Sequence, residues 1–87
     1  SLEEYQEKLI KEASANGYQI NDSGTVTLGG YPYLACKASF GFSDGTSHFS
    51  EAYVRRIDDK IVELRFDYYE ELKDKAAFVL ASLGQTD

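Results

Sequence analysis

The sequence predicts an α+β domain: an antiparallel sheet of four or five strands, with an N-terminal and a C-terminal helix packed on one face. Three observations support this class. Apolar residues recur at helical spacing near both ends of the chain. The middle of the chain alternates apolar and polar residues, and short turn signals divide it into strands that must pair antiparallel. A chain of 87 residues has the length of one domain, so a single domain is expected over residues 1–87.

The first helix is expected to begin after Ser1 and to be ended by Asn16-Gly17. Ser1 and Glu4 have the spacing of a capping box, in which each residue satisfies a free backbone N–H of the other. Leu2 and Leu9 lie on one apolar stripe at helical spacing. Gly17 supplies the left-handed conformation that commonly ends a helix.

Short strands are expected at residues 18–20 and 25–28, and the stretch 29–57 then sets the register of the sheet. Apolar and polar residues alternate from 33 to 42, and Asp44-Gly45 predicts a two-residue hairpin loop. With that loop, residue 40 opposes residue 49. The predicted buried face then combines alternate residues of both strands: Leu34, Cys36, Ala38, Phe40 and Phe42 with Ser47, Phe49, Glu51, Tyr53, Arg55 and Ile57.

A second turn at residues 58–60 leads into the last strand and the second helix. Any even-length loop there places Val62, Leu64, Phe66 and Tyr68 on the same face as Phe49. The helix is expected to start between residues 67 and 70, to carry an apolar stripe from residue 72 to residue 83, and to end at Gly84. Both helices are amphipathic, so each is expected to cover the one apolar face and leave the other face open.

Composition excludes several classes of partner and site. A net charge of −6 argues against nucleic acid, whose binding needs a concentrated basic surface. No apolar run approaches the ~20 residues needed to cross a bilayer, so no membrane insertion is expected. The single cysteine, Cys36, excludes an internal disulfide and a multi-cysteine zinc site, and it is expected to act as a small buried hydrophobe. No cofactor is expected.

The open face of the sheet is the expected binding surface, because it mixes apolar and charged side chains. The alternative is an ordinary solvated face whose charges balance across neighbouring strands. The residues expected to contact a partner on this face are Tyr33, Lys37, His48, Val54, Arg56 and Arg65. The expected partner is a protein or a small ligand.

The one histidine and three of the tyrosines are expected to be exposed. His48 is the one histidine, and no other His or Cys stands at ligand spacing, so it is expected to be a plain exposed side chain and not a metal ligand. It is also expected on the face opposite Cys36. Among the tyrosines, Tyr31, Tyr33 and Tyr69 are expected to be exposed and able to stack on a partner.

Glu51 and Arg55 do not fit the predicted register, which places both charges on the core face. A buried unpaired charge costs several kcal/mol, so either these residues lie beyond the cover of the helices or a bulge reverses part of the strand. The functional alternative is a pocket formed by Glu51, Tyr53 and Arg55. No second acid or base stands ready to cooperate with Glu51, so no catalysis is expected.

The element order resembles the PsbP-like family. The features that carry the resemblance are Gly29-Gly30-Tyr31-Pro32 before a strand, the long hairpin around Asp44-Gly45, the strand segment 62–66 and the terminal Ala81-Ser82-Leu83. The resemblance covers residues 1–83 and is to a truncated or minimal member, because the extra N-terminal strands of longer family domains are missing. It implies a non-catalytic binding or assembly factor. It also implies an exported or membrane-anchored bacterial protein, although the composition suits the cytoplasm equally well.

The sequence therefore predicts a non-catalytic binding or assembly domain that uses the open face of its sheet. Two alternatives remain open at this point. One is a ligand-pocket protein or enzyme using Glu51, Tyr53 and Arg55, and the other is a structural domain of a larger exported polypeptide.

Overall fold

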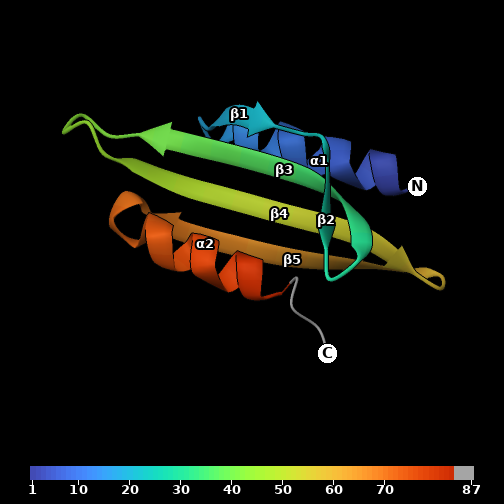
Figure 1. Ribbon diagram of the computed structural model, residues 1–87. Coiled ribbons are helices and arrows are strands. Elements are labelled where there is room, and N and C mark those ends of the chain that lie inside the picture. Colours follow the sequence, from blue (N-terminus) through green and yellow to red (C-terminus); the bar gives the residue numbers. More distant parts are fainter. Residues whose placement is uncertain (84–87) are drawn as a thin grey trace.

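The computed structural model describes residues 1–83 and confirms the α+β class (Figure 1). In chain order the elements are helix α1 (Leu2–Ala15), strands β1 (Gln19–Asp22), β2 (Thr25–Leu28), β3 (Tyr31–Gly41), β4 (Ser47–Ile57) and β5 (Lys60–Tyr69), the 3₁₀ turn η1 (Glu70–Leu72) and helix α2 (Lys73–Ser82). All five strands belong to one antiparallel sheet. Its order is β1-β3-β4-β5, and β2 pairs with the first part of β3.

Helix α1 begins and ends where the sequence predicts. The Glu4 N–H donates to Ser1 Oγ at 3.2 Å, and the N-terminal amine donates to Glu4 Oε1 at 2.9 Å, which completes the capping box. After Asn16 the chain turns at Gly17, whose φ of +86° is the conformation that favours glycine.

The main core lies between α1 and the sheet. It consists of Leu9 from α1, Cys36 from β3, and Ala52 and Val54 from β4. The sheet contributes mostly small side chains here, so the helix can lie close to the strands. Cys36 is a free, buried thiol as expected, and burial raises its pKa, which keeps it protonated and apolar.

The β3–β4 hairpin differs from the prediction by one residue. The Phe42 N–H donates to the Thr46 carbonyl at 2.8 Å, so the loop contains three residues, 43–45, instead of two. Gly45 adopts a φ of +90°, the left-handed conformation that a three-residue loop requires at its last position. Asp44 Oδ1 accepts hydrogen bonds from the backbone N–H and the hydroxyl of Thr46, at 2.9 and 2.6 Å.

This odd loop length reverses the two faces of β4 relative to β3, because side chains alternate along a strand. Leu34 pairs with Val54, so both face α1. Glu51, Tyr53 and Arg55 face the other way, and their predicted place on the face of Leu34 is wrong. The pairing of β3 with β4 runs without a register shift, so no bulge reverses part of the strand.

The second hairpin follows the prediction. Ile57 pairs with Lys60 across a two-residue loop, in which Asp58 takes a φ of +57°. An even-length loop preserves the faces. Phe49 pairs with Tyr68, so the two share a face as expected. The alternate apolar residues of β5 therefore share a face with Phe49 and Tyr53.

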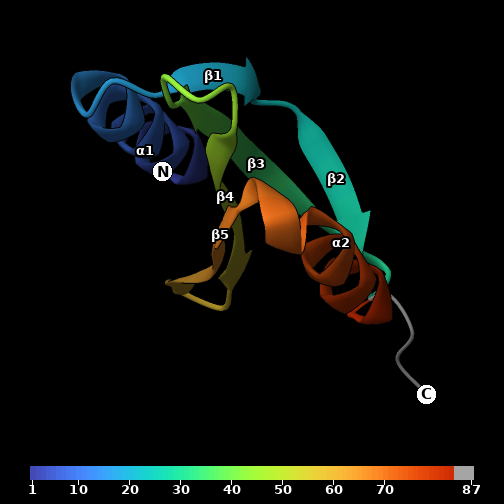
Figure 2. The same cartoon turned by 90° about the vertical axis from the view of Figure 1, so that its left-hand side faces the viewer.

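The helices lie on opposite faces of the sheet, so the prediction that they share one face is wrong (Figure 2). Lys73 Nζ of α2 lies 5.4 Å from the ring centre of Phe49, and Val79 lines a hollow with Phe66 and Tyr68, all on the side away from α1. The physical reason is the register of β4, which gives both faces apolar residues that need cover. We call these two sides the α1 face and the α2 face.

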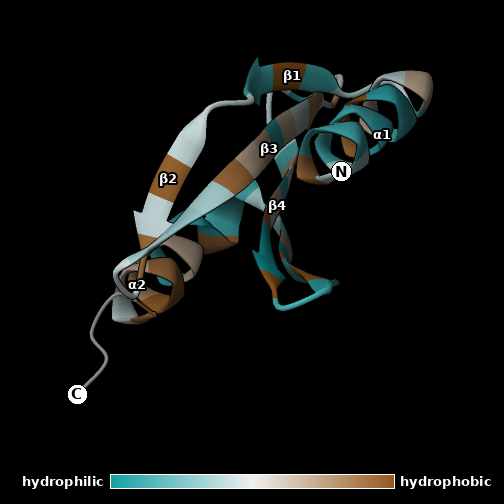
Figure 3. Ribbon diagram, turned by 90° about the vertical axis from the view of Figure 1, so that its right-hand side faces the viewer, coloured by the Kyte–Doolittle hydropathy of each residue, from teal (hydrophilic) through white to brown (hydrophobic). Residues whose placement is uncertain are grey.

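Helix α2 covers its face only loosely. β5 continues to Tyr69, so the helical segment begins at the late end of the predicted range, and no residue of α2 is buried. Phe78 is 76% exposed, and much of the α2 ribbon has the colour of hydrophobic residues (Figure 3). Gly84, expected to end this helix, lies outside the described residues. Neither helix within residues 1–83 has the length and apolar character needed to cross a membrane.

Candidate functional site

The predicted binding set does not form one surface. His48, Val54, Arg56 and Arg65 lie on the α1 face, whereas Tyr33 and Lys37 lie on the α2 face. The two groups lie on different faces because the first hairpin loop has three residues instead of the predicted two. Val54 is fully buried beneath α1 and is not available to a partner.

The predicted pocket of Glu51, Tyr53 and Arg55 is instead a packed cluster on the α2 face. The Tyr53 hydroxyl donates to Glu51 Oε1 at 2.7 Å, and the Tyr68 hydroxyl donates to Glu51 Oε2 at 2.6 Å. We call Glu51, Tyr53 and Tyr68 the Glu51 clamp. Arg55 turns away, its guanidinium 3.8 Å from the ring centre of Tyr31.

The electrostatics of the Glu51 clamp indicate a structural role. Burial and then the hydrogen bond to Glu51 raise the pKa of Tyr53 far above its ordinary value, and the same causes raise the pKa of Tyr68. Both tyrosines therefore remain neutral donors, and each carboxylate oxygen already has a donor. This explains how Glu51 is tolerated on a partly buried face.

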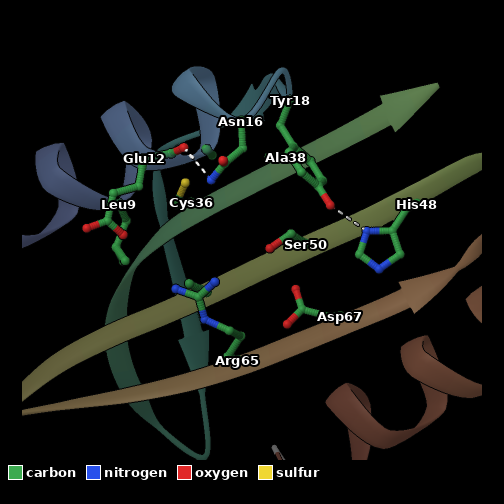
Figure 4. Close-up of a pocket in the computed structure, with 12 residues that line it drawn as sticks. Leu9, Glu12, Asn16, Tyr18, Cys36, Ala38, His48, Ser50, Arg65 and Asp67 are labelled. Atoms are coloured by element: carbon green, nitrogen blue, oxygen red, sulfur yellow. Dashed lines mark hydrogen bonds between the residues drawn. The ribbon is translucent and has the colours of Figure 1, made fainter.

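On the α1 face, a cleft of about 340 Å³ opens between the helix and the last three strands (Figure 4). Its floor is two cross-strand rows, Ala38-Ser50-Asp67 and Cys36-Ala52-Arg65. Tyr18 and His48 close one end of the cleft. Its wall is the C-terminal half of α1, which contributes Leu9, Glu12 and Ala13, followed by Asn16 at the end of the helix. We call this space the α1 cleft.

A chain of hydrogen bonds orients the cation of the α1 cleft. Tyr5 donates its hydroxyl proton to Glu63 Oε1 at 2.7 Å, and Arg65 Nε donates to Glu63 Oε2 at 2.7 Å. Partial burial works against ionisation of Glu63, but these hydrogen bonds lower its pKa overall. The hydrogen bond to Glu63 raises the pKa of Arg65, so the guanidinium stays charged beside the cleft.

His48 stands at the end of the α1 cleft and is tied to Tyr18. The Tyr18 oxygen lies 2.8 Å from His48 Nδ1. The prediction that His48 lies on the face opposite Cys36 is wrong, since both residues face α1. They do not act together, because His48 is four residues along β4 from Ala52, the partner of Cys36, or about 13 Å at the usual rise of a strand.

Beyond the Tyr18–His48 pair lies a second space of about 280 Å³, which we call the aromatic hollow. It is lined by Asn16, Tyr18, Phe40, Phe42, His48 and Tyr69. Phe40, His48 and Tyr69 form one row across β3, β4 and β5, and Phe42 follows at the start of the hairpin loop. The ring centres lie 4.9 Å apart for His48 and Tyr69 and 6.2 Å apart for Phe42 and Tyr69.

Three rings of the aromatic hollow, those of Phe40, Phe42 and Tyr69, are open to solvent. Phe42 is 40% exposed and Tyr69 is 56% exposed, and the predicted exposure of Tyr69 is confirmed. The alternating pattern predicts Phe40 and Phe42 in the core, and for that reason this site was missed. The signal that identifies it is their position beyond the end of α1, where no helix covers the sheet.

A third space of about 250 Å³ adjoins the aromatic hollow and shares Tyr69 with it. Its charged lining is entirely negative: Asp44 from the hairpin loop, and Glu70 and Glu71 from η1. We call it the acidic hollow. Hydrogen bonds from the Thr46 side chain and backbone lower the pKa of Asp44, so this carboxylate is ionised at neutral pH.

The described residues offer no ready metal site, since residues 1–83 contain no group of three or more His, Cys, Asp or Glu side chains placed to hold an ion. Comparison of the chain with protein-family models, curated proteins and solved structures finds no match. The resemblance to the PsbP-like family stays a prediction, and a functional assignment depends on the geometry of the α1 face.

Proposed function

We propose that this chain is a non-catalytic binding or assembly domain that holds a partner on its α1 face, along the α1 cleft and the aromatic hollow. The observation that carries the proposal is the set of exposed aromatic rings gathered beside a polar cleft where α1 ends. Contiguous exposed apolar surface rimmed by polar groups is typical of interaction sites. Aromatic side chains are also enriched among residues that dominate binding energy.

The arrangement of reactive groups favours binding over catalysis. Both oxygens of Glu51 are engaged by tyrosine hydroxyls, and the thiol of Cys36 is buried and far along the sheet from His48. General acid–base or nucleophilic chemistry needs two such groups within hydrogen-bonding reach of a substrate. The resemblance to PsbP-like assembly factors, with the exported location that it implies, supports the same proposal.

A peptide library displayed on phage tests the proposal even though the partner is unidentified. Peptides selected on the immobilised domain are expected to shift the backbone amide resonances of Phe40, Phe42, His48 and Tyr69 in ¹H–¹⁵N spectra. The Tyr69→Ser variant should no longer bind them. Tyr31→Ser is the matched control, because Tyr31 is 54% exposed, much like Tyr69, but lies at the other end of β3.

Resonance shifts confined to α2 or to the α2 face would contradict the proposal. Loss of binding in the Tyr31→Ser control to the same degree as in Tyr69→Ser would contradict it too, because the effect would then not depend on the aromatic hollow.

The exposed apolar residues of α2 favour a second candidate, a structural domain of a larger exported polypeptide. Phe78 is 76% exposed, and Leu72 and Val79 are 43% and 45% exposed. Further chain or another subunit would bury this remaining apolar surface. Hydrogen exchange of α2 amides in the complete gene product, compared with residues 1–87 alone, tests this candidate. Slower exchange in the complete product supports it, and equal rates count against it.

A further inference from the structure

Four aromatic rings, those of Tyr18, Phe40, Phe42 and Tyr69, line the aromatic hollow. Phe40 lies 5.8 Å from Tyr18 and 5.4 Å from Phe42, centre to centre, and Phe42 stacks on Tyr69 with 29° between the ring planes. Aromatic faces carry partial negative charge and attract cations that approach within about 6 Å. The hollow therefore offers a favourable place for a positive group.

The chain itself supplies cations to its other aromatic rings but not to these. On the α2 face, Lys37 lies over Tyr53, Arg55 over Tyr31, and Lys73 over Phe49. Within the part of the chain that the structure describes, no Lys or Arg side chain lies over the four rings of the aromatic hollow, and none lines it.

The charge beside these rings is negative. The acidic hollow begins at Tyr69 and carries Asp44, Glu70 and Glu71, with no Lys or Arg in its lining among residues 1–83. The chain as a whole has a net charge of −6. A positive group that enters the aromatic hollow thus meets aromatic rings, and the carboxylates of the acidic hollow adjoin the same Tyr69.

Building on the proposed binding function, we propose that the aromatic hollow receives a lysine or arginine side chain from a basic segment of a partner protein. The cation lies against the rings of Phe42 and Tyr69. A neighbouring basic residue of the same segment reaches Glu70 and Glu71. Long-range attraction to the acidic surface speeds the encounter, and the rings set where the segment docks.

Titration of the domain with two short peptides, followed in ¹H–¹⁵N spectra, tests this inference. The probes are tetraarginine and tetracitrulline, since citrulline matches arginine in shape but lacks the charge. Tetraarginine is expected to shift the amides of Phe42, Tyr69 and Glu70, and to bind more weakly as salt is added. Tetracitrulline is expected to bind at least ten-fold more weakly.

Two variants with a matched control separate the rings from the carboxylates. Tyr69→Leu keeps an apolar side chain but removes the ring, and should weaken tetraarginine binding about two- to five-fold, as for an exposed cation–π contact. The double variant Glu70→Gln/Glu71→Gln should weaken it by a similar factor. Glu3→Gln/Glu7→Gln makes the same change in net charge on the exposed side of α1 and should leave the affinity nearly unchanged.

Equal binding of both peptides at the aromatic hollow would overturn the cation inference while the proposed binding function stands. Equal weakening by both double variants would also overturn it, because attraction would then reflect net charge alone. Tetraarginine shifts that avoid the aromatic hollow would overturn the inference as well, and the phage selection would then decide on the binding surface independently.

Discussion

Removing either tyrosine hydroxyl of the Glu51 clamp should lower the free energy of unfolding, because each hydroxyl donates a short hydrogen bond to Glu51. In Tyr53→Phe the carboxylate loses a donor at 2.7 Å, and in Tyr68→Phe it loses one at 2.6 Å. Hydrogen bonds to a charged group contribute about 1.5–3 kcal/mol each. Tyr53 is fully buried, so its substitution should lie toward the upper part of that range.

The same two tyrosines make stability depend on alkaline pH. Burial and the bond to Glu51 raise the pKa of both side chains in the folded state, whereas in the unfolded chain a tyrosine ionises near pH ~10. The unfolded state therefore releases protons first as pH rises. The stability contributed by the neutral hydroxyls is fully present below about pH 10 and declines above it, by about 1.4 kcal/mol per pH unit for each tyrosine.

Urea unfolding followed by circular dichroism, at pH 7 and at several values above about pH 10, measures both effects. Tyr53→Phe and Tyr68→Phe should start less stable at pH 7, and each should lose stability less steeply with pH than the unaltered chain. Tyr31→Phe serves as the control for removing an exposed hydroxyl. An alkaline slope in the clamp variants as steep as that of the unaltered chain would refute the reasoning.

Three further changes test the core, the first hairpin and α2, each by the free energy of unfolding in urea. Leu9→Ala should cost about 2–5 kcal/mol, because the side chain is 7% exposed and packs on the small residues beneath α1. Gly45→Ala should cost about 1–2 kcal/mol through its φ of +90° alone, since an added Cβ meets open space; a larger loss would indicate a different loop. Phe78→Ser should change stability by less than about 0.5 kcal/mol, and a substantial loss would show that this ring packs against the domain.

Local signals were enough to predict most elements of this fold. The capping box and Gly17 define α1, because both act within one turn of the helix. The second hairpin followed from the parity of its loop, since any even length gives the same faces. Such features depend on residues close in sequence, so a single chain contains the information that they need.

Local signals did not determine the loop length of the first hairpin. Asp44-Gly45 suits both a two-residue loop and the last two positions of a three-residue loop, and only the second gives the observed register. The sequence did contain a deciding observation, because the two-residue loop would place Glu51 and Arg55 on the face with Leu34 and Cys36. In the observed register Ala52 and Val54 occupy the space beneath α1, and Glu51 finds two tyrosine donors on the other side. The apparent misfit of the charges was itself evidence against the shorter loop.

The position of the aromatic hollow follows from a difference in length that periodicity does not express. Helix α1 has 14 residues and spans about 21 Å, whereas β3 has 11 residues and spans about 37 Å. Alternation assigns Phe40 to the α1 face but does not say whether the helix reaches it. Because α1 ends at Ala15 and the chain turns back at Gly17, the last part of β3 and its partners lie beyond the helix. There the rings that alternation assigns to a core become a surface open to a partner.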